Sequence, residues 1–306
     1  MSTVVIQSLP SGASDARRIA SLLGVPMLDI ALHRFPDGEL RITTGPAAAT
    51  TIIYAPLDRP NDKLVALLFA CEALRRGGAK RLVLVAPYLC YMRQDAAFRP
   101  GEAISQRAVG RLLAGMVDRV ITVDAHLHRT TDITTIFPGI AVDNLSAMPA
   151  IADVLGTARL EADTVIVGPD AESEPWVNDL ASRLGVAHAI AQKTRHGDRS
   201  VDIALANPRL VKGRPVLLVD DIVSSGGTLI ACAKALVAAG ARTIDVIVTH
   251  ALFPAELHDT MVGAGVRSIR STHTVPHPSN AIPLDATLAM ALRSEVGDVG
   301  RRGATA

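Results

Sequence analysis

Aromatic residues and cysteines are scarce in this chain of 306 residues. Aromatic side chains make up 3% of the residues, with Trp176 as the single tryptophan, so a stacking platform for single-stranded nucleic acid is not expected. The three cysteines, Cys71, Cys90 and Cys232, are odd in number, show no Cys-x-x-Cys spacing and lie in or beside apolar segments. This usage indicates buried thiols in a reducing compartment and disfavours both disulfides and a cysteine metal site.

The sequence also lacks an excess of charge of either sign and a long apolar run. Lys and Arg number 31 and Asp and Glu 30, a formal net charge of +1, so no global field attracts nucleic acid or an anionic membrane. No apolar run reaches the ~18 residues that a membrane span needs. The N-terminal Met-Ser-Thr-Val-Val-Ile has no basic region or apolar core of a signal peptide. We therefore expect a cytoplasmic protein that binds neither nucleic acid nor membranes and that holds any anion at a local site.

Short apolar runs that end abruptly in polar residues are frequent. Runs without polar alternation indicate strands buried on both faces, which is typical of parallel sheets covered by helices. The strands expected on this basis are Leu82–Ala86, Val120–Val123, Thr164–Val167, Val216–Val219 and Val246–Val248. Apolar residues at three- and four-residue spacing predict the intervening helices Asp62–Arg76, Ser105–Gly115, Pro175–Leu184 and Thr228–Ala239. This alternation of strands and helices predicts an α/β fold.

The chain is long enough for two domains with separate cores. Residues 73–80 resemble residues 235–242, since both combine a helix end, glycine and a basic residue before a strand. This repeat favours two similar lobes, for which we expect the boundaries 1–147 and 148–306. Ligands of open parallel sheets bind beyond the carboxyl ends of the strands, so the polar residues that follow the runs are the first candidates for a site.

Residues 216–228 have the composition of a phosphate-binding loop. A buried strand leads through Asp220 and Asp221 into the small residues Ser224, Ser225, Gly226 and Gly227, and then through Thr228 into a helix. Glycines let the backbone approach an anion, and a helix N-terminus adds about half a positive charge. The paired acids would repel a bare phosphate, but they suit the vicinal hydroxyls of a ribose or its bound Mg²⁺. The segment resembles the ribose 5-phosphate loop of the type I phosphoribosyltransferase superfamily.

The first 145 residues resemble the N-terminal domain of the ribose-phosphate diphosphokinase family, and the ribose loop of the chain is more similar to that of its shorter archaeal-type members. The matching segments, in order along the chain, are Phe35–Glu39, Pro60–Asp62, Pro87–Asp95, Glu102–Ser105 and Asp124–His126. The resemblance implies two phosphoribosyltransferase-type lobes, each a mainly parallel sheet flanked by helices. It further implies a Mg²⁺-dependent enzyme that moves the β,γ-diphosphoryl group of ATP to the 1-hydroxyl of ribose 5-phosphate, which gives phosphoribosyl diphosphate and AMP.

The resemblance also implies where ATP and the metal would bind. Arg93 and Gln94, with the neighbouring Asp95, would contact ATP. The loop of Phe35, Asp37, Gly38 and Glu39 would reach the adenine pocket across a subunit interface, as part of a homo-oligomer, either a dimer or a hexamer. His126 would be a ligand of the ATP-bound Mg²⁺, and Asp170 would help to organise metal and ribose.

Lys193 and Arg195 resemble the cations of the family's catalytic loop. Attack of the ribose 1-hydroxyl on the β-phosphorus of ATP spreads negative charge over several oxygens, which two cations would stabilise. Alternation along an extended segment places both side chains on one face.

Three departures from the common family pattern stand out, namely Ser-Ser-Gly-Gly-Thr in the ribose loop, Glu172-Ser173 after Asp170, and Ala96 after Arg-Gln-Asp. Two other functions stay open at this point. One is a phosphoribosyltransferase that consumes phosphoribosyl diphosphate, against which the matched N-terminal segments argue. The other is a non-catalytic, synthetase-like regulatory subunit, against which the presence of Lys193, Arg195 and the paired acids argues.

Overall fold

The computed structural model describes residues 3–297 except 128, 131, 159 and 196–200, and of residues 193–195 and 201–202 it describes the backbone only. The chain forms two compact units. The first comprises the described residues of Met1–Leu145, Thr274–Pro276 and Leu284–Ala306, and the second comprises those of Ser146–His273 and His277–Pro283. The division near residue 145 lies close to the expected boundary, whereas the last helix packs with the first unit instead of the second.

The first unit is built on a six-stranded parallel sheet with the order β2-β1-β5-β6-β7-β8. Its strands are β1 (Val4–Ser8), β2 (Met27–Asp29), β5 (Thr50–Tyr54), β6 (Arg81–Val85), β7 (Arg119–Val123) and β8 (Ala141–Leu145). A separate antiparallel hairpin consists of β3 (Ala31–Arg34) and β4 (Leu40–Thr43). The central strands are buried along nearly their whole length, as their unbroken apolar runs predict.

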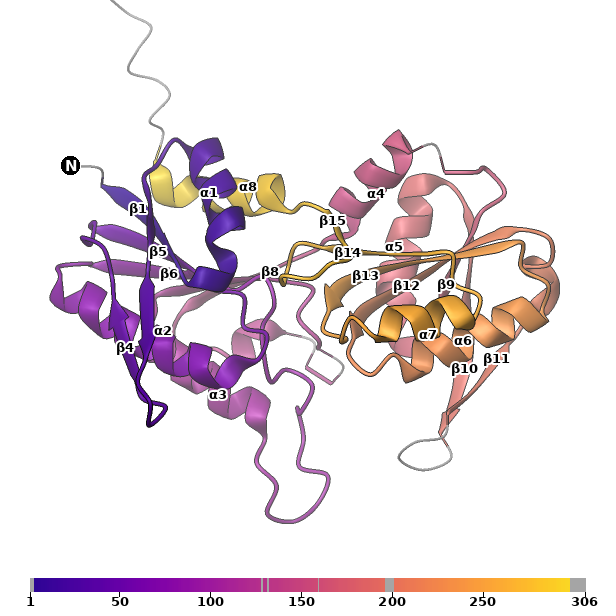
Figure 1. Cartoon of the computed structure of the whole chain (residues 1–306), viewed down its shortest axis with the longest axis horizontal. Helices are drawn as coiled ribbons and strands as arrows, with labels where there is room; N and C mark the ends of the chain where they lie inside the picture. The colour runs from indigo at the N-terminus through magenta and orange to yellow at the C-terminus, as the bar shows by residue number, and fades with distance from the viewer. Residues whose placement is uncertain (1–2, 128, 131, 159, 196–200, 298–306) are drawn as a thin grey trace, which may run out of the picture. The chain divides into compact units, whose positions relative to one another are not determined.

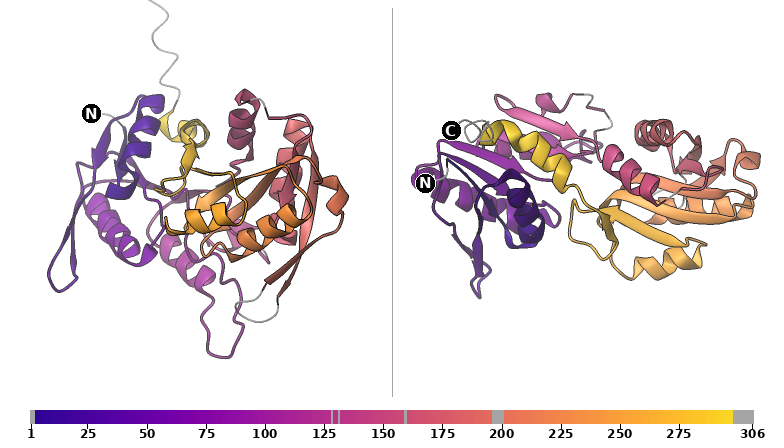
Figure 2. Two further views of the ribbon diagram at one scale, coloured as in Figure 1. Left: turned by 45° about the vertical axis from the view of Figure 1, so that its right-hand side comes forward. Right: turned by 90° about the horizontal axis from the view of Figure 1, so that it is seen from above.

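Helices cover both faces of this sheet (Figure 1). They are α1 (Ala13–Leu23), α2 (Pro60–Arg76), α3 (Ser105–Ala114) and α8 (Asp285–Val296), with 3₁₀ turns at Pro10–Gly12 and Ile133–Thr135. The chain leaves β1 toward β2 on one side and proceeds from β5 to β7 on the other. Because such crossovers are right-handed, α1 lies on one face and α2 and α3 on the opposite face. The indigo α1 and the yellow α8 pack side by side, as Figure 2 shows from two further directions.

The second unit repeats this plan with a seven-stranded sheet of the order β11-β10-β9-β12-β13-β14-β15. Its strands are β9 (Val165–Gly168), β10 (Ala187–Arg195), β11 (Val201–Leu205), β12 (Pro215–Val223), β13 (Thr243–Ala251), β14 (Ser268–Thr272) and β15 (Asn280–Ile282). All neighbours are parallel except β10 and β11. Its helices are α4 (Met148–Thr157), α5 (Glu174–Leu184), α6 (Gly227–Ala238) and α7 (Leu257–Gly263), with 3₁₀ turns at Ala171–Ser173 and Pro208–Leu210.

The direction of chain progression reverses between β9 and β12, so α4 and α5 lie on one face of the second sheet and α6 and α7 on the other (Figure 1). The predicted α/β fold with two similar, mainly parallel lobes is confirmed. Each strand expected from an apolar run is present as β6, β7, β9, β12 or β13. In the described part of the chain, no helix is long and apolar enough to cross a membrane.

Two details differ from the sequence-based expectation. Strand β12 does not end at Val219 but continues through Asp220 and Asp221 to Val223, because β13 runs alongside and pairs with it as far as Ala251. Helix α8 packs against α1 of the first unit, and charged groups at the start of β6 and β7 bind it there.

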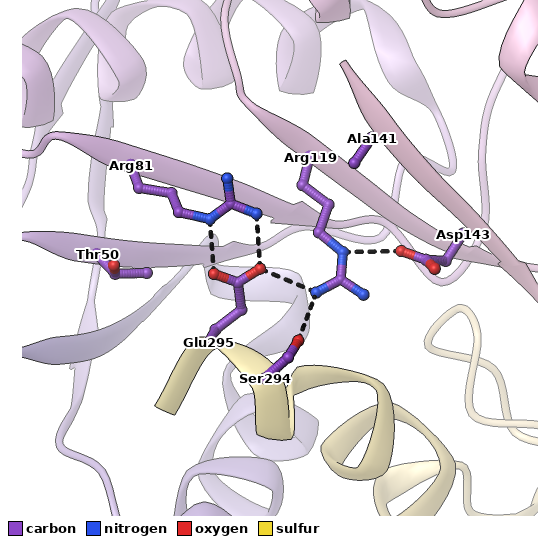
Figure 3. A pocket seen from close by; sticks show the side chains of 7 residues that line it. All are labelled: Thr50, Arg81, Arg119, Ala141, Asp143, Ser294 and Glu295. Carbon is purple, nitrogen blue, oxygen red and sulfur yellow. Dashed lines mark hydrogen bonds and ion pairs between the residues drawn. The ribbon is translucent and has the colours of Figure 1, made fainter. Parts of the chain in front are cut away.

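Glu295 on α8 is the centre of a partly buried ion-pair network at the amino edge of the first sheet (Figure 3). Arg81, the first residue of β6, donates two hydrogen bonds to its carboxylate at 2.6 and 2.8 Å. Arg119, the first residue of β7, donates another at 2.9 Å and also binds Asp143 at 2.8 Å. The Glu295 side chain is 6% exposed. These ion pairs therefore join α8 to the sheet. The pocket that they line lies at the edge opposite the carboxyl ends of the strands.

We expect Glu295→Ala to lower the free energy of unfolding by about 2 kcal/mol at neutral pH, because it leaves Arg119 without its buried partner. The hydrogen bonds, first that from Arg81 and then that from Arg119, hold the pKa of Glu295 below its ordinary value. A carboxylate with a lowered pKa stabilises the fold above its ordinary pKa and loses that contribution as pH falls through the lowered one.

Denaturant titrations at several pH values measure this effect, and the stabilities of the wild type and the variant should converge as pH falls through the lowered pKa of Glu295. Glu72→Ala is the matched control, since Glu72 pairs with Arg76 on the exposed surface of α2 in the same unit and should cost less than about 0.5 kcal/mol. Equal effects of the two variants would contradict the structural role of Glu295.

Candidate active site

The phosphate loop of the second unit lies between β12 and α6. Gly226 precedes α6 in the left-handed conformation with φ 73°, and its carbonyl accepts a hydrogen bond from Ile230 N at 2.9 Å. A Cβ atom at this position would lie 2.4 Å from Leu257 Cδ2, so both the backbone conformation and the space require glycine. Gly226 has no side chain that could cap α6, so the positive end of the helix is presented to a ligand beside Ser225 and Gly227.

The paired acids lie just before this loop, at the carboxyl end of β12. Asp221 is buried and its carboxylate accepts a hydrogen bond from Ile222 N at 2.7 Å. Asp220 is partly exposed and its carboxylate accepts one from Asp221 N at 3.0 Å. These backbone contacts fix the orientation of both carboxylates before any ligand binds, which is the condition for pre-organised recognition.

Asp170 brings a third carboxylate to the same edge of the sheet. It follows β9, the parallel neighbour of β12, and caps the 3₁₀ turn Ala171–Ser173 by accepting a hydrogen bond from Glu172 N at 3.1 Å. The hydroxyl of Ser173 donates to Asp170 O at 2.5 Å. Glu172 itself is exposed, while Ser173 is buried. Glu172 and Ser173 replace the residues common in the family at these positions. Of the two, Ser173 stabilises the turn that begins at Asp170.

Asp170 and Asp220 lie at the carboxyl ends of two neighbouring parallel strands, β9 and β12, in which Val167 pairs with Leu218. Burial, and then the charges of Asp220 and Asp170, raise the pKa of the Cys232 thiol of α6 to about 12. Both acids thus lie at the carboxyl edge of the sheet, at the point where the order of the strands reverses. Ligands of doubly wound sheets bind at this point.

All three cysteines are buried free thiols, as expected. Burial also raises the pKa of Cys71 and of Cys90 to about 12, so neither forms a reactive thiolate at neutral pH.

The carboxylates at the edge of the second sheet are oxygen donors, which are the ligands that Mg²⁺ prefers, whereas the predicted ligand His126 of the first unit would offer a nitrogen. Among the residues that the structure describes, no group of three or more His, Cys, Asp and Glu is arranged to hold a metal ion. Mg²⁺ is commonly bound by one or two carboxylates, with water and substrate phosphates in the other positions. Asp170, Asp220 and Asp221 fit this mode of binding, and they do not form a complete protein cage.

The Arg93 loop of the first unit follows β6. Tyr91 has a left-handed backbone with φ 62°, and its hydroxyl donates a hydrogen bond to Asn61 at the start of α2. The Gln94 side chain accepts a hydrogen bond from Ser105 Oγ at 3.1 Å. The Asp95 carboxylate accepts hydrogen bonds from Arg129 at 2.7 Å and from its backbone N at 3.3 Å, and its side chain is 3% exposed. Arg93 is exposed, whereas the Asp95 carboxylate is occupied within the protein.

His126 lies on the next loop of the same unit, after β7. The loop starts at Asp124, whose left-handed backbone has φ 38° and whose N donates to Leu145 O at 2.8 Å. Ala125 N donates to Asn144 Oδ1 at 2.9 Å. His126 is buried. A non-glycine residue in this conformation costs of order 1 kcal/mol or more, and such strain gathers at functional loops.

The loop of Phe35–Glu39 lies at the tip of the β3–β4 hairpin. Gly38 adopts φ 94°, and its N donates to Phe35 O at 2.9 Å. The Asp37 carboxylate accepts from Glu39 N at 3.1 Å. Both acids are exposed in the single chain, as a loop that completes a site on another subunit would be. Arg34 at the base of the loop pairs with Asp62 of α2.

Lys193 and Arg195 lie near the end of β10, opposite Ile203 and Val201 of β11. They occupy alternate positions of one strand, as the alternation predicts. Their side chains lie outside the described residues, so the predicted catalytic role of both stays a prediction.

The structure adds residues that no motif singled out for a role. Arg129 binds Asp95, Asn144 holds the His126 loop, and Gln106 contacts the Arg93 loop. Arg129 and Asn144 carry no sequence signal, because their partners are far away in the chain. From the sequence, Asn61 was noted only as a member of the matched segment Pro60–Asp62.

Comparisons with known proteins identify both halves of the chain. Residues 4–116 match the N-terminal domain of ribose phosphate pyrophosphokinase, and residues 143–283 match the phosphoribosyl transferase domain. The ribose-phosphate pyrophosphokinase of Methanopyrus kandleri is 31% identical over 298 residues, which cover 96% of this chain and all of that protein. The enzyme of the same name from Streptomyces avermitilis is 30% identical and covers 94% of this chain and 88% of its own length.

The fold agrees with these sequence matches. The crystal structure of phosphoribosylpyrophosphate synthetase from Mycobacterium smegmatis superposes with a TM-score of 0.83 at 26% identity, over 95% of this chain and 98% of that one. Since the similarity extends over nearly the full length in both sequence and fold, the predicted resemblance is confirmed: this chain belongs to the ribose-phosphate pyrophosphokinase family.

Proposed function

We propose that this chain is a ribose-phosphate diphosphokinase that transfers the β,γ-diphosphoryl group of ATP to the 1-hydroxyl of ribose 5-phosphate. The products are phosphoribosyl diphosphate and AMP. The observation that supports this most directly is the position of Asp170 and Asp220 at the carboxyl ends of the neighbouring parallel strands β9 and β12, of which β12 leads into the glycine loop before α6, in a chain that matches enzymes of this name over nearly its whole length.

Each predicted residue has a chemical task in this reaction. The loop Ser224–Thr228 holds the 5-phosphate through its amides and hydroxyls, and Asp220 and Asp221 accept hydrogen bonds from the ribose hydroxyls. Bound Mg²⁺ would neutralise phosphate charge and order the triphosphate, with His126 as a ligand of the ATP-bound ion. Asp170 would help to organise metal and ribose. Lys193 and Arg195 stabilise the charge that develops on the transferred group.

The nucleotide is bound by residues of the first unit. Arg93 and Gln94, with the neighbouring Asp95, contact the nucleotide. The loop of Phe35, Asp37, Gly38 and Glu39 completes the adenine pocket of a neighbouring subunit in a homo-oligomer. Alignment of two polyanions in line contributes about 7 to 11 kcal/mol to the lowering of the barrier. We further propose a cytoplasmic location, with ATP and ribose 5-phosphate as the partners and with neither nucleic acid nor membrane involved.

The assay that tests the reaction uses the purified chain with ATP, Mg²⁺ and ribose 5-phosphate, followed by phosphorus NMR. We expect stoichiometric AMP and phosphoribosyl diphosphate, and neither in the absence of ribose 5-phosphate or after chelation of Mg²⁺ with EDTA. A phosphoribosyltransferase would instead consume added phosphoribosyl diphosphate and a base without forming AMP from ATP. A regulatory subunit would give no turnover in any of these mixtures, and that outcome would refute the proposal.

A further inference from the structure

Gln106 is a buried polar side chain that joins the two loops with candidate nucleotide and metal residues. It is the second residue of α3 and 2% exposed. Its amide Nε2 donates to Met92 O at 3.2 Å, directly before Arg93. Its Oε1 accepts from Thr130 Oγ1 at 3.1 Å, in the loop after His126. Its own backbone N donates to Gln94 O at 3.2 Å.

These contacts use the donor and acceptor of the amide on different loops. The amide nitrogen can bind the Met92 carbonyl only as a donor, and the amide oxygen can bind the Thr130 hydroxyl as an acceptor. An apolar side chain of the same size would leave the carbonyl of the buried Met92 without this donor and the Thr130 hydroxyl without this acceptor. A carboxylate would place an acceptor against the Met92 carbonyl. The chemistry of the site therefore requires glutamine rather than a residue of similar volume.

Two neighbouring contacts strengthen the same connection. Ser105, which precedes Gln106, donates its hydroxyl to Gln94 Oε1 at 3.1 Å and so holds the Gln94 side chain. Arg129, which precedes Thr130, binds the buried Asp95 carboxylate at 2.7 Å and stacks over Phe98. The Arg93 loop and the His126 loop are thus tied to each other directly and, through Gln106, to the rigid start of α3.

We infer that Gln106 is a positioning residue for ATP, because it fixes the Arg93–Gln94 loop relative to the His126 loop. This inference rests on the proposed function. Asp95 and Arg129 belong to the same framework, in which the Asp95 carboxylate orients the loop from within the protein. In the proposed reaction, Arg93, Gln94 and His126 act on the same bound nucleotide. Loss of the Gln106 hydrogen bonds that join their two loops therefore weakens binding of the nucleotide and leaves binding of the sugar phosphate unchanged.

Gln106→Leu tests this inference, because it keeps the approximate volume and removes both side-chain hydrogen bonds. We expect the KM for MgATP to rise at least about tenfold, the equivalent of about 1.4 kcal/mol. The KM for ribose 5-phosphate should stay within about twofold, as its site lies in the second unit. The assays are run well below the melting temperature of the variant, which is measured in parallel.

Gln7→Leu is the matched control. Gln7 is also fully buried in the first unit, and its amide makes three hydrogen bonds to the backbone of Gly45 and Pro46 at 2.9 to 3.2 Å. These bonds involve no candidate site residue. We expect Gln7→Leu to lower the melting temperature about as much as Gln106→Leu and to leave the KM for MgATP unchanged. An equal change of KM in both variants would overturn the inference.

A pair of variants at Thr130 keeps the test decisive if Gln106→Leu does not fold. Thr130→Val removes the hydroxyl that donates a hydrogen bond to Gln106 Oε1, whereas Thr130→Ser keeps this hydroxyl. We expect about a fivefold higher KM for MgATP with valine and near wild-type values with serine. Equal values for valine and serine would refute the inference. Failure of the wild type to form AMP in the same assay would refute the proposed reaction, so the two failures are distinguishable.

Discussion

Replacement of Lys193 by alanine lowers turnover by at least about a hundredfold and leaves the affinity for ATP nearly unchanged, because a cation that meets charge only in the transition state contributes to kcat and not to binding. Lys193 lies near the end of β10, where the strand pairs with β11. Arg195 lies two positions further on in the same strand, so its replacement should lower turnover in the same way.

Steady-state kinetics of AMP formation and a separate titration of nucleotide binding measure the two quantities. Lys212→Ala serves as the control for the loss of one positive charge, since Lys212 is exposed in the same unit and precedes β12 at the amino edge of the sheet. The carboxylates of the site lie at the opposite edge. If Lys193→Ala keeps wild-type turnover, the assignment of the catalytic cations to this segment is wrong.

The fold was predictable because each central strand carries its own signal. An unbroken run such as Leu82–Ala86 or Val216–Val219 is buried on both faces, and burial of this kind is visible in the sequence alone. The continuation of β12 through Asp220 was not visible, because it depends on backbone pairing with β13 and not on the side chains of β12.

The position of α8 was not predictable for a related reason. The contacts that hold it join Glu295 to Arg81 and Arg119, which lie 214 and 176 residues away in the chain. A single sequence contains no signal that pairs one glutamate with two distant arginines. The assignment of residues 148–306 to one domain therefore followed chain order, whereas the fold returns the last helix to the first unit.

The candidate site divides in the same way. Motifs with a local chemical logic, such as the glycine loop at Gly226, could be placed from the sequence, and the structure places Asp170 and Asp220 at the ends of neighbouring strands at the same edge of the sheet. The residues that hold the site loops in place could not be identified from the sequence. In the sequence, Gln106 is an ordinary residue of the first turn of a predicted helix. Its contacts with the two loops are found only in the folded structure.

Asp220→Asn should weaken binding of ribose 5-phosphate about tenfold to a hundredfold, because hydrogen bonds to a charged acceptor contribute about 1.5 to 3 kcal/mol. The substitution isolates the charge. An asparagine Oδ1 can still accept the hydrogen bond that Asp220 now receives from Asp221 N, so the end of β12 keeps its conformation. Nucleotide affinity should be unaffected, since the predicted ATP residues lie in the first unit.

Calorimetric titration with ribose 5-phosphate measures the change, with Asp163→Asn as the control. Asp163 is a half-exposed acid of the same unit, and it precedes β9 at the amino edge of the sheet, away from the glycine loop. We expect wild-type affinity for that variant. Wild-type affinity for Asp220→Asn as well would show that the sugar phosphate is held without this carboxylate, and the paired acids at the end of β12 would then need a different role.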